Sequence, residues 1–275
     1  DLSPYKFRGL GGKGKSEKWV NVLPIPDEYR RAKTNFAEEA IANLNQCGPL
    51  AGVLIESMLS CAGQIPLPSG YLPTLAKEIR DKGGLLIADE VQVGFGRTGS
   101  NMWAFQDSEV IPDIVVMGKP MGNGHPMAAV FTTNAIASSF GGMEFFSTFG
   151  GNPVSCAIGM AVLDVIEEEE LVTKARLLGA RMISGLESLK DDYELIGDIR
   201  GKGLFLGMEL VRNRANLEPA PREATMLVDN MRDVGVLLST DGPLHNVIKI
   251  KPPMVLIEDD IDETLSKLDS CLASL

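Results

Sequence analysis

Short apolar runs alternate with helix-like patterns along the first half of the chain. Apolar residues recur at helical spacing in residues 34–48 and again in residues 72–84, where two glycines end the pattern. The runs that suit buried strands lie at residues 50–57, 85–90, 113–119 and 128–133. Helices that alternate with buried strands predict an α/β domain with a mostly parallel sheet.

The pattern changes in the second half of the chain. A long helical stretch over residues 153–190 contains the acidic run "IEEEEL", which we interpret as a solvated helix face. The elements predicted after it are two strands and a turn in 195–211, a helix running into a strand in 222–239, an edge strand in 246–254 ended by two prolines, and an amphipathic helix in 258–275. We therefore predict a large domain over residues 1–165, then a linking helix and a smaller α+β domain over residues 166–275.

Composition is that of an ordinary globular protein and argues against two classes of partner. Of the 275 residues, 44% are hydrophobic and 23% are charged, and the net charge is −11. This acidic balance disfavours a nucleic-acid surface and an anionic membrane face, because both need clustered positive charge. No apolar run is long enough for a transmembrane helix, and residues 1–10 lack the apolar core of a signal peptide. We expect small-molecule ligands and a cytoplasmic location.

The cysteines and histidines exclude several kinds of site. Cys47, Cys61, Cys156 and Cys271 lie far apart and form no C-x-x-C pair, so we expect neither a zinc site nor a disulfide framework. Reduced thiols in a cytosolic setting are the simple expectation. The chain has two histidines, which leaves few options for a Ser/His/Asp hydrolase.

The segment "GLGGKGKS" at residues 9–16 matches the letters of a nucleotide-binding P-loop. A P-loop needs a buried strand before it and a helix after it, and this segment has neither. Residues 19–23 alternate like a strand, and Pro24 and Pro26 interrupt any helix that would follow. We interpret the segment as a flexible basic surface loop. A nucleotide-binding enzyme would instead lose ATP affinity on Lys15→Ala.

Polar side chains follow three of the predicted buried strands. They are Glu56, the pair Asp89 and Glu90, and Lys119. In parallel α/β sheets, ligands collect beyond the carboxyl ends of the strands. A lysine and a carboxylate on adjacent strands suggest that the lysine forms a Schiff base with pyridoxal phosphate while the acid keeps the pyridine nitrogen protonated. Spacing alone leaves a simple salt bridge open as the alternative.

Several longer motifs carry a family resemblance. The motifs that together resemble class-III pyridoxal-phosphate-dependent aminotransferases, of the fold-type-I superfamily, are IADEVQVGFGRTG (87–99), VMGKPMGNGHPMAAV (116–130), STFGGNPVSCAIG (147–159) and IGDIRGKGLFLGMEL (196–210). The segments most similar to the alanine–glyoxylate aminotransferase-like subgroup are 56–71, 118–126 and 247–254. That subgroup includes phospho-lyases acting on phosphoethanolamine and phosphohydroxylysine.

The resemblance implies a role for each of five residues toward the cofactor. Lys119 would carry the Schiff base and move a proton, and Asp89 would pair with the pyridine nitrogen. Gln92 would approach the phenolic oxygen, and Val91 would pack on the ring face. Thr148 would hydrogen-bond the cofactor phosphate of a neighbouring subunit, which implies a homodimer with shared active sites.

The resemblance also implies substrate contacts. Glu56 occupies the place of an active-site-wall glutamate. Many family members clamp the substrate carboxylate with an arginine where this chain has Lys249, and a lysine lacks the bidentate fork of a guanidinium. Lys249, Lys251 and Arg97 are therefore candidate anion contacts, with a structural role as the alternative for Lys251. We interpret His125 as a turn residue near the site.

The implied function is transfer of an amino group from an amine or amino acid to a 2-oxo acid. The lysine at position 249 suits the phospho-lyase branch, in which phosphate and ammonia are eliminated from a phosphorylated amine. A non-catalytic fragment or structural subunit is the alternative from another class. Family members run longer at the N-terminus, so we expect a truncated chain that lacks part of the phosphate loop and the aromatic residue stacked on the ring.

Overall fold

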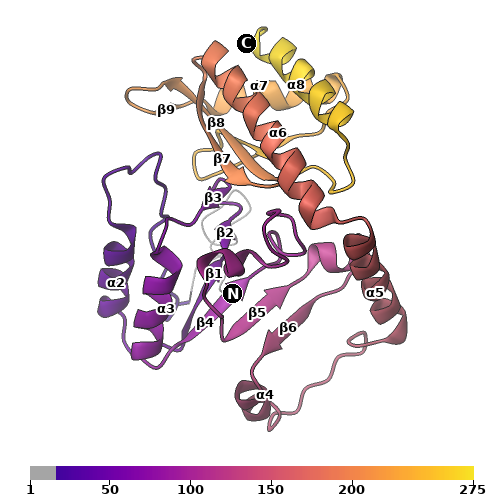
Figure 1. Ribbon diagram of the computed structural model, residues 1–275. Helices are drawn as coiled ribbons and strands as arrows, with labels where there is room; N and C mark the ends of the chain where they lie inside the picture. Colours follow the sequence, from indigo (N-terminus) through magenta and orange to yellow (C-terminus); the bar gives the residue numbers. More distant parts are fainter. Residues whose placement is uncertain (1–16) are drawn as a thin grey trace.

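A computed structural model describes residues 17–275, and the glycine-rich segment 9–16 lies outside the described residues. The described residues form two larger sheets, one in the lower and one in the upper part of Figure 1, with helices around each, and a separate two-stranded hairpin. The described residues before the first helix contain turns but no strand, so the strand predicted for residues 19–23 is wrong. Pro24 and Pro26 follow at once, and their missing amide donors leave little length for pairing.

The first sheet has four strands in the order β1-β4-β5-β6. Strands β1 (Gly52–Glu56), β4 (Leu85–Asp89) and β5 (Ile114–Met117) run parallel, and β6 (Ala129–Thr132) pairs with β5 in the antiparallel direction. The predicted α/β class with a mostly parallel sheet is confirmed.

The connections between the parallel strands hold the first layer of helices. A short hairpin of β2 (Met58–Leu59) and β3 (Ile65–Pro66), followed by helix α3 (Tyr71–Asp81), joins β1 to β4. The 3-10 turn η1 (Ala104–Ser108) lies between β4 and β5, and η2 (Lys119–Gly122) follows β5.

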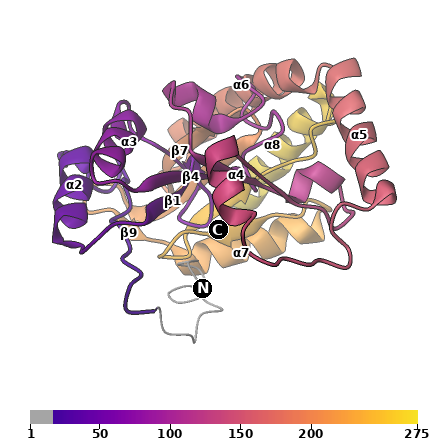
Figure 2. The same cartoon turned by 90° about the horizontal axis from the view of Figure 1, so that it is seen from below.

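Helix α2 (Phe36–Gln46) lies beside α3 on one flank of the first sheet (Figures 1 and 2). Asn35 begins α2 by accepting a hydrogen bond from the Glu38 amide at 3.2 Å. The side chains that α2, α3 and β4 bury together are Phe36, Ala40, Leu44, Tyr71, Leu72, Leu75, Ala76, Ile79 and Leu86.

The second sheet is antiparallel, in the order β10-β11-β8-β7. Its strands are β7 (Ile196–Lys202), β8 (Phe205–Asn213), β10 (Ser239–Asp241) and β11 (Val247–Ile250), and β9 (Glu218–Pro219) pairs with the end of β8. Because β11 pairs on both sides, its prediction as an edge strand is wrong. The two prolines lie beyond its last paired residue and remove no bond from the ladder.

Three helices cover this sheet: α6 (Leu171–Asp192), α7 (Pro221–Asp233) and α8 (Glu258–Leu272) (Figure 1). Their apolar faces share one core with the strands. The fully buried members of this core include Met182, Leu186, Ile196, Leu206, Met208, Leu210, Leu227, Met231, Ile248 and Ile261.

The stretch predicted as one helix over 153–190 is two helices, α5 (Pro153–Glu168) and α6. The acidic run spans the break, and Glu170 has a φ of 50°. Consecutive negative charges at the C-terminus of α5 oppose the helix dipole, which favours ending the helix there. The predicted domain boundary at residue 165 falls within α5 and stays a prediction.

An apolar surface lies on β6, the short helix α4 (Asn134–Phe140), residues 141–152 and α5. We call Phe140, Phe145, Phe146 and Phe149 the aromatic patch; their exposed fractions are 52%, 72%, 84% and 85%. Other exposed apolar side chains on these elements are Val130, Phe131, Met143, Val154, Met160, Leu163 and Val165. Among the described residues, no helix combines the length and apolarity needed to cross a bilayer.

Candidate active site

The first sheet brings three of the predicted site residues to one edge. Glu56 ends β1 and pairs in register with Asp89, which ends β4. Asp89 in turn pairs with Val116 of β5, and Lys119 follows Val116 by three residues. Parallel strands end at the same edge, so the two carboxylates and the lysine come from adjacent strand ends.

Lys119 occupies a strained backbone position directly after β5. Its φ is 26°, in the left-handed region that a non-glycine residue rarely adopts. The preceding Gly118 is extended, and Pro120 fixes the next residue in the turn η2. Within the described residues, Lys119 forms no ion pair with Asp89 at 4.0 Å or less, so a simple salt bridge is not observed. Such strain clusters at functional sites, where the surrounding structure holds a side chain in place.

Asp89 and Glu90 face different surroundings. Asp89 Oδ1 accepts from the Val91 amide at 3.0 Å, and Asp89 is only partly buried. Glu90 is fully buried and accepts from Ser57 Oγ at 2.5 Å and from two amides of η1 at 2.9 and 3.0 Å. Desolvation raises the pKa of Glu90, and these hydrogen bonds oppose the rise. Glu90 therefore anchors the loop after β4, which leaves Asp89 as the carboxylate at the strand edge.

The arrangement fits a planar cofactor held between a lysine and an acid. A methyl group placed on Gly118 would lie 3.8 Å from Val91 Cγ1, so the Val91 side chain sits beside the backbone that carries Lys119. A partly exposed carboxylate, a branched apolar side chain and an exposed amine thus surround one edge of the sheet. These are the groups that a pyridine nitrogen, a ring face and an aldehyde need.

A chain of hydrogen bonds extends from Glu56 toward the second sheet. Glu56 accepts from the Ser60 amide at 2.8 Å and from Ser60 Oγ. Gln92 Nε2 donates to Ser60 Oγ at 2.6 Å, and Lys251 Nζ donates to Gln92 Oε1 at 2.9 Å. The ammonium of Lys251 also lies 4.0 Å from the centroid of the Phe205 ring.

Glu56 and Lys251, at the two ends of this hydrogen-bond chain, both have pKa values shifted toward the neutral form. Burial raises the pKa of Glu56, and the nearby Asp89 raises it further, while Ser60 and Lys251 act in the opposite direction. Burial and the neighbouring Lys249 lower the pKa of Lys251 to about 8. Paired groups with opposed shifts are typical of functional sites.

Two of the three predicted anion contacts, Lys249 and Arg97, already bind other groups of the protein. Lys249 Nζ lies 3.4 Å from Asp241 Oδ2, and Asp241 also accepts from Gln64 at 2.8 Å. Arg97 Nη1 donates to the carbonyls of Leu204 at 3.2 Å and Pro252 at 2.8 Å. Burial lowers the pKa of Arg97. Arg97 thus connects the loop after β4 to the second sheet.

Thr148 is not on the segments at the ends of β4 and β5 that carry the other predicted cofactor residues. It belongs to the exposed segment between α4 and α5, next to Phe149 of the aromatic patch.

His125 lies in the turn after η2, and its Nε2 is 2.8 Å from Ser155 Oγ at the start of α5. It is therefore a loop residue that holds two segments together.

Ser60 was missed by sequence reasoning, although it connects Glu56 to Gln92. Its hydroxyl becomes relevant only through the turn after β1, where the Gly63 and Gln64 amides donate to the Ser60 carbonyl at 2.9 and 3.0 Å. The segment 57–64 has no hydrophobic period that could have predicted this turn. The one hint in the sequence was that Ser60 follows Glu56 by only four residues.

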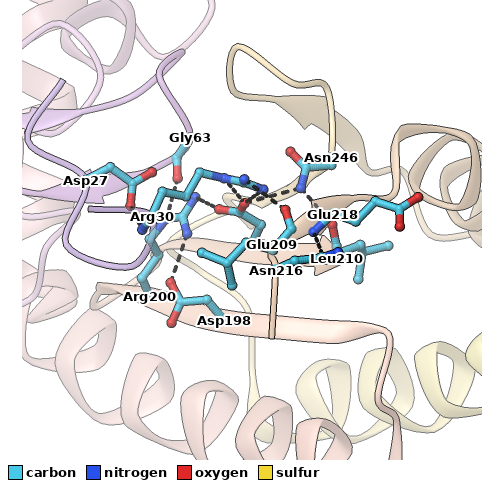
Figure 3. Close-up of polar contacts among 11 residues, drawn as sticks. Asp27, Arg30, Gly63, Asp198, Arg200, Glu209, Leu210, Asn216, Glu218 and Asn246 are labelled. Atoms are coloured by element: carbon cyan, nitrogen blue, oxygen red, sulfur yellow. Dashed lines mark hydrogen bonds and ion pairs between the residues drawn. The ribbon is translucent and has the colours of Figure 1, made fainter. Parts of the chain in front are cut away.

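A second polar cluster lies beside the site, around the buried carboxylate of Glu209 (Figure 3). Glu209 accepts from Arg30 Nε at 2.6 Å and lies 2.7 Å from Arg200 Nη2. Arg200 also bonds Asp198 at 2.8 Å and the Gly63 carbonyl at 2.7 Å. A cavity of about 340 Å³ opens beside it. Because acids already pair with Arg200, the described residues that line the cavity offer no free cation for an anionic ligand.

Comparison with known proteins identifies the family of this chain. The sequence pattern of the class-III aminotransferases matches residues 12–272. The chain belongs to the class-III aminotransferases. Membership of this family implies pyridoxal phosphate as the cofactor, in agreement with the groups gathered at the strand edge. No cluster of metal-binding side chains occurs in the part of the chain that the structure describes.

Two relatives of this class-III chain carry different names. It is 45% identical to a Drosophila melanogaster alanine–glyoxylate aminotransferase 2-like protein and covers 59% of that protein's length. It is 41% identical to the Caenorhabditis elegans ethanolamine-phosphate phospho-lyase homolog 1 and covers 63% of it. These alignments include 100% and 99% of this chain.

A solved structure supports the same fold. The chain superposes on an Arthrobacter phospholyase, determined in complex with phosphoethanolamine, with a TM-score of 0.91 and 40% identity. The match covers 97% of this chain and 66% of the phospholyase. This class-III chain thus corresponds to somewhat less than two thirds of the length of the proteins that it resembles.

Proposed function

We propose that this chain is part of a pyridoxal-phosphate-dependent enzyme that moves an amino group from an amine or amino acid to a 2-oxo acid. The observation that carries the proposal is the register Glu56–Asp89–Val116, which brings two carboxylates and Lys119 to one edge of the sheet. The class-III family assignment supports the same reaction.

Pyridoxal phosphate, when bound, would delocalise the electron pair that stays on the substrate Cα when the α-proton is removed. Lys119 would hold the cofactor through Nζ, and its amine would move a proton at the substrate Cα. Asp89 stabilises the protonated pyridine nitrogen with a carboxylate that the strand end fixes in place. Val91 packs on the ring face, and Gln92 donates to the phenolic oxygen.

The substrate side of the site is more polar. Glu56 forms one wall, and burial raises the pKa of its carboxyl above the ordinary value. Lys249 and Arg97 are the proposed contacts to substrate anions. Both are engaged by protein groups here, so anion binding at Lys249 would compete with Asp241.

Reduction with borohydride tests the role of Lys119. We expect purified protein mixed with pyridoxal phosphate to be labelled on the peptide that contains Lys119, as read by mass spectrometry. Lys119→Ala removes the label from that peptide and abolishes the visible absorbance of the bound cofactor. A label that goes mainly to another lysine, or equal labelling of the variant, contradicts the proposal and favours a non-catalytic subunit.

A phospho-lyase is the second candidate function. The Arthrobacter phospholyase is more similar to this chain, at 40% identity, than several solved transaminases that match it at 25% to 31%. Lys249 also supports the phospho-lyase, because the point charge of a lysine suits a phosphate as well as a carboxylate. In this reaction Lys119 would remove a proton from the amine-bearing carbon, phosphate would leave from the neighbouring carbon, and water would then release ammonia and an aldehyde.

Two assays separate the candidates. A transaminase turns over only when a 2-oxo acid accepts the amino group, and it releases no phosphate. A phospho-lyase releases phosphate from phosphoethanolamine without any acceptor. Phosphate release that is independent of added 2-oxo acid would decide for the lyase, and strict dependence on the acceptor would decide for the transaminase.

We also propose that the functional unit is a homodimer with shared active sites. The exposed Thr148 lies next to the aromatic patch, which is the kind of surface that a second copy covers. Thr148 would then reach the cofactor phosphate held by the other subunit. The cytoplasmic location remains a prediction from composition.

A further inference from the structure

The hydrogen-bond chain between Lys251 and Glu56 runs in one direction. Lys251 Nζ donates to Gln92 Oε1 at 2.9 Å, and Gln92 Nε2 donates to Ser60 Oγ at 2.6 Å. Ser60 Oγ and the Ser60 amide both donate to the Glu56 carboxylate. The chain therefore starts at a cation, ends at an anion and crosses from the second sheet to the first.

The ammonium determines which way the Gln92 amide points. An ammonium has donors only, whereas an amide has one acceptor oxygen and one NH2 donor group. The acceptor oxygen must therefore face Lys251, and the NH2 group must face Ser60. A flipped amide would set two donors against each other at 2.9 Å and would leave the Ser60 hydroxyl without its donor.

Lys251 is held in place independently of Gln92. Its ammonium lies over the ring of Phe205, which is fully buried. Arg97 donates to the carbonyl of Pro252, the next residue in the chain, at 2.8 Å. The Phe205 ring holds the lysine side chain, and the Arg97 hydrogen bond holds the adjacent backbone. The position of Lys251 therefore does not depend on the Gln92 amide, which can rotate.

We propose that Lys251 is a positioning residue that locks the Gln92 amide with its NH2 group directed into the active site. One N–H of that group bonds Ser60, and the other is left for an oxygen of the cofactor or the substrate. Besides Ser60, the Gln92 Nε2 atom has the Cys61 sulfur as a weak acceptor at 3.7 Å. The inference deepens the proposed function and rests on it for the identity of the ligand.

The charges around Lys251 keep it protonated near neutral pH. Lys249 opposes the positive charge, whereas Asp241, Glu56 and Cys61 favour it, and burial brings its pKa to about 8. At pH 7 the ammonium is therefore the main form. A neutral amine could accept as well as donate, which would release the constraint on the amide.

Hydrogen exchange of the Gln92 side chain measures this constraint without any cofactor. In ¹⁵N NMR spectra at pH 6.5, the Gln92 NH2 signals are assigned by their loss in Gln92→Glu. We expect Lys251→Met to speed their exchange with water by roughly tenfold or more, since a hydrogen bond to a charged group is lost. Lys251→Arg retains slow exchange, and so does Lys249→Met, whose lysine contacts Asp241 instead. Exchange within twofold of the parent rate in Lys251→Met overturns the proposal.

Competitive acetylation tests the contact from the lysine side. In the parent, we expect Lys251 to react half-maximally near pH 8, well below exposed lysines in the same protein. Gln92→Glu places a carboxylate at the same distance and is expected to raise that midpoint by at least one pH unit. An unchanged midpoint would show that the two side chains do not touch, and the proposal would then fail.

Turnover reports on the proposed function separately. If the cofactor-loaded parent is active, Lys251→Met is expected to lower kcat by roughly tenfold or more with KM changed less than threefold, and Lys251→Arg to restore most of the loss. An active parent whose kcat is unaffected by Lys251→Met refutes the positioning role. An inactive parent contradicts the proposed function, and the two cofactor-free measurements then decide the amide orientation.

Discussion

At the residue scale, the site separates unlike charges by neutral groups. Glu56 and Lys251 are both partly withdrawn from water, and Ser60 and Gln92 lie between them. A direct ion pair would satisfy both charges but would leave them little to offer a ligand. With neutral groups between them, each charge is only partly compensated, as the raised pKa of Glu56 and the lowered pKa of Lys251 indicate.

The lowered pKa of Lys251 predicts how its contribution to stability depends on pH. Its folded-state value of about 8 lies below the ordinary 10.5, so the unfolded chain binds more protons between these values. The free energy of unfolding therefore rises with pH across that window because of this group. Lys251→Met removes the dependence. Relative to the variant, we expect the parent to gain on the order of 2 kcal/mol from about pH 7.5 to 10, after allowance for partial exposure.

Urea unfolding at several pH values checks this expectation. Lys33→Met is the control, since Lys33 is exposed in the segment before α2. Its difference from the parent should stay constant over the same range. A parallel drift in both variants would assign the effect to general charge, and a falling parent advantage would reverse the sign and contradict the burial of Lys251.

How far the site could be predicted depended on where each residue lies. Glu56, Asp89 and Lys119 each end an apolar run, and a polar residue at that point is visible in the sequence. Ser60 and Lys251 owe their places to a turn and to the packing of the second sheet against the first. No local pattern encodes a contact between Lys251 and Gln92, which are 159 residues apart.

At the element scale, helix α6 packs closely against the turn between β7 and β8. A Cβ placed on Gly179 would lie 2.2 Å from the carbonyl oxygen of Gly203 in that turn. Gly203 itself has a φ of 55° and approaches the backbone of Thr98. Three segments thus meet backbone to backbone, so glycine at 179 is required by space and not by conformation.

Two glycines of the same helix provide a matched test of this packing. Gly179→Ala meets rigid backbone and is expected to cost about 2 kcal/mol or more in the free energy of unfolding, since overpacking forces the elements apart. The nearest atoms to a Cβ at Gly185 belong to the Leu265 side chain and not to backbone, and that side chain is only partly buried, so it has more freedom to shift. The gain in helix propensity then offsets most of its cost. Equal destabilisation of the two variants, measured by urea unfolding, would contradict this account.

The elements themselves were largely predictable, and the errors have local causes. The period of the apolar residues predicted the strands of the first sheet and the terminal helix α8. It could not detect the break before α6, because Glu169 and Glu170 fit a polar helix face as well as a turn. The central place of β11 depends on β10, which begins at Ser239, the residue where the strand predicted after α7 was expected to end.

At the scale of the whole molecule, buried charges connect segments that are far apart in sequence. Glu209 joins Arg30 of the segment before α2 to Arg200 of β7 (Figure 3). Glu209→Gln leaves the Arg30 side chain without an acidic partner among the described residues and leaves Arg200 with Asp198 alone, and we expect a loss of about 3 kcal/mol in the free energy of unfolding. Asp262→Asn breaks an exposed pair with Arg181 and should leave the unfolding midpoint close to the parent value.

Limited proteolysis gives a second measurement of the same contact. If Glu209 holds the segment before α2 in place, Glu209→Gln is expected to speed cleavage within residues 17–34 before the rest of the chain unfolds. A variant that loses stability without earlier cleavage there would show that the segment is held by other contacts.

The aromatic patch supplies the last prediction, which concerns assembly. Four exposed phenylalanines within ten residues of one another are costly to leave in water, and a stable dimer needs about 800 Å² of such surface per subunit. We expect the parent to sediment as a dimer and Phe149→Asp to shift it to monomer, because a carboxylate cannot be buried there unpaired. Ile111→Asp changes an equally exposed apolar residue outside the patch and should remain dimeric. A monomeric parent, or a Phe149→Asp dimer as tight as the parent, would remove the basis for sharing Thr148 between subunits, since that residue could then reach no second active site.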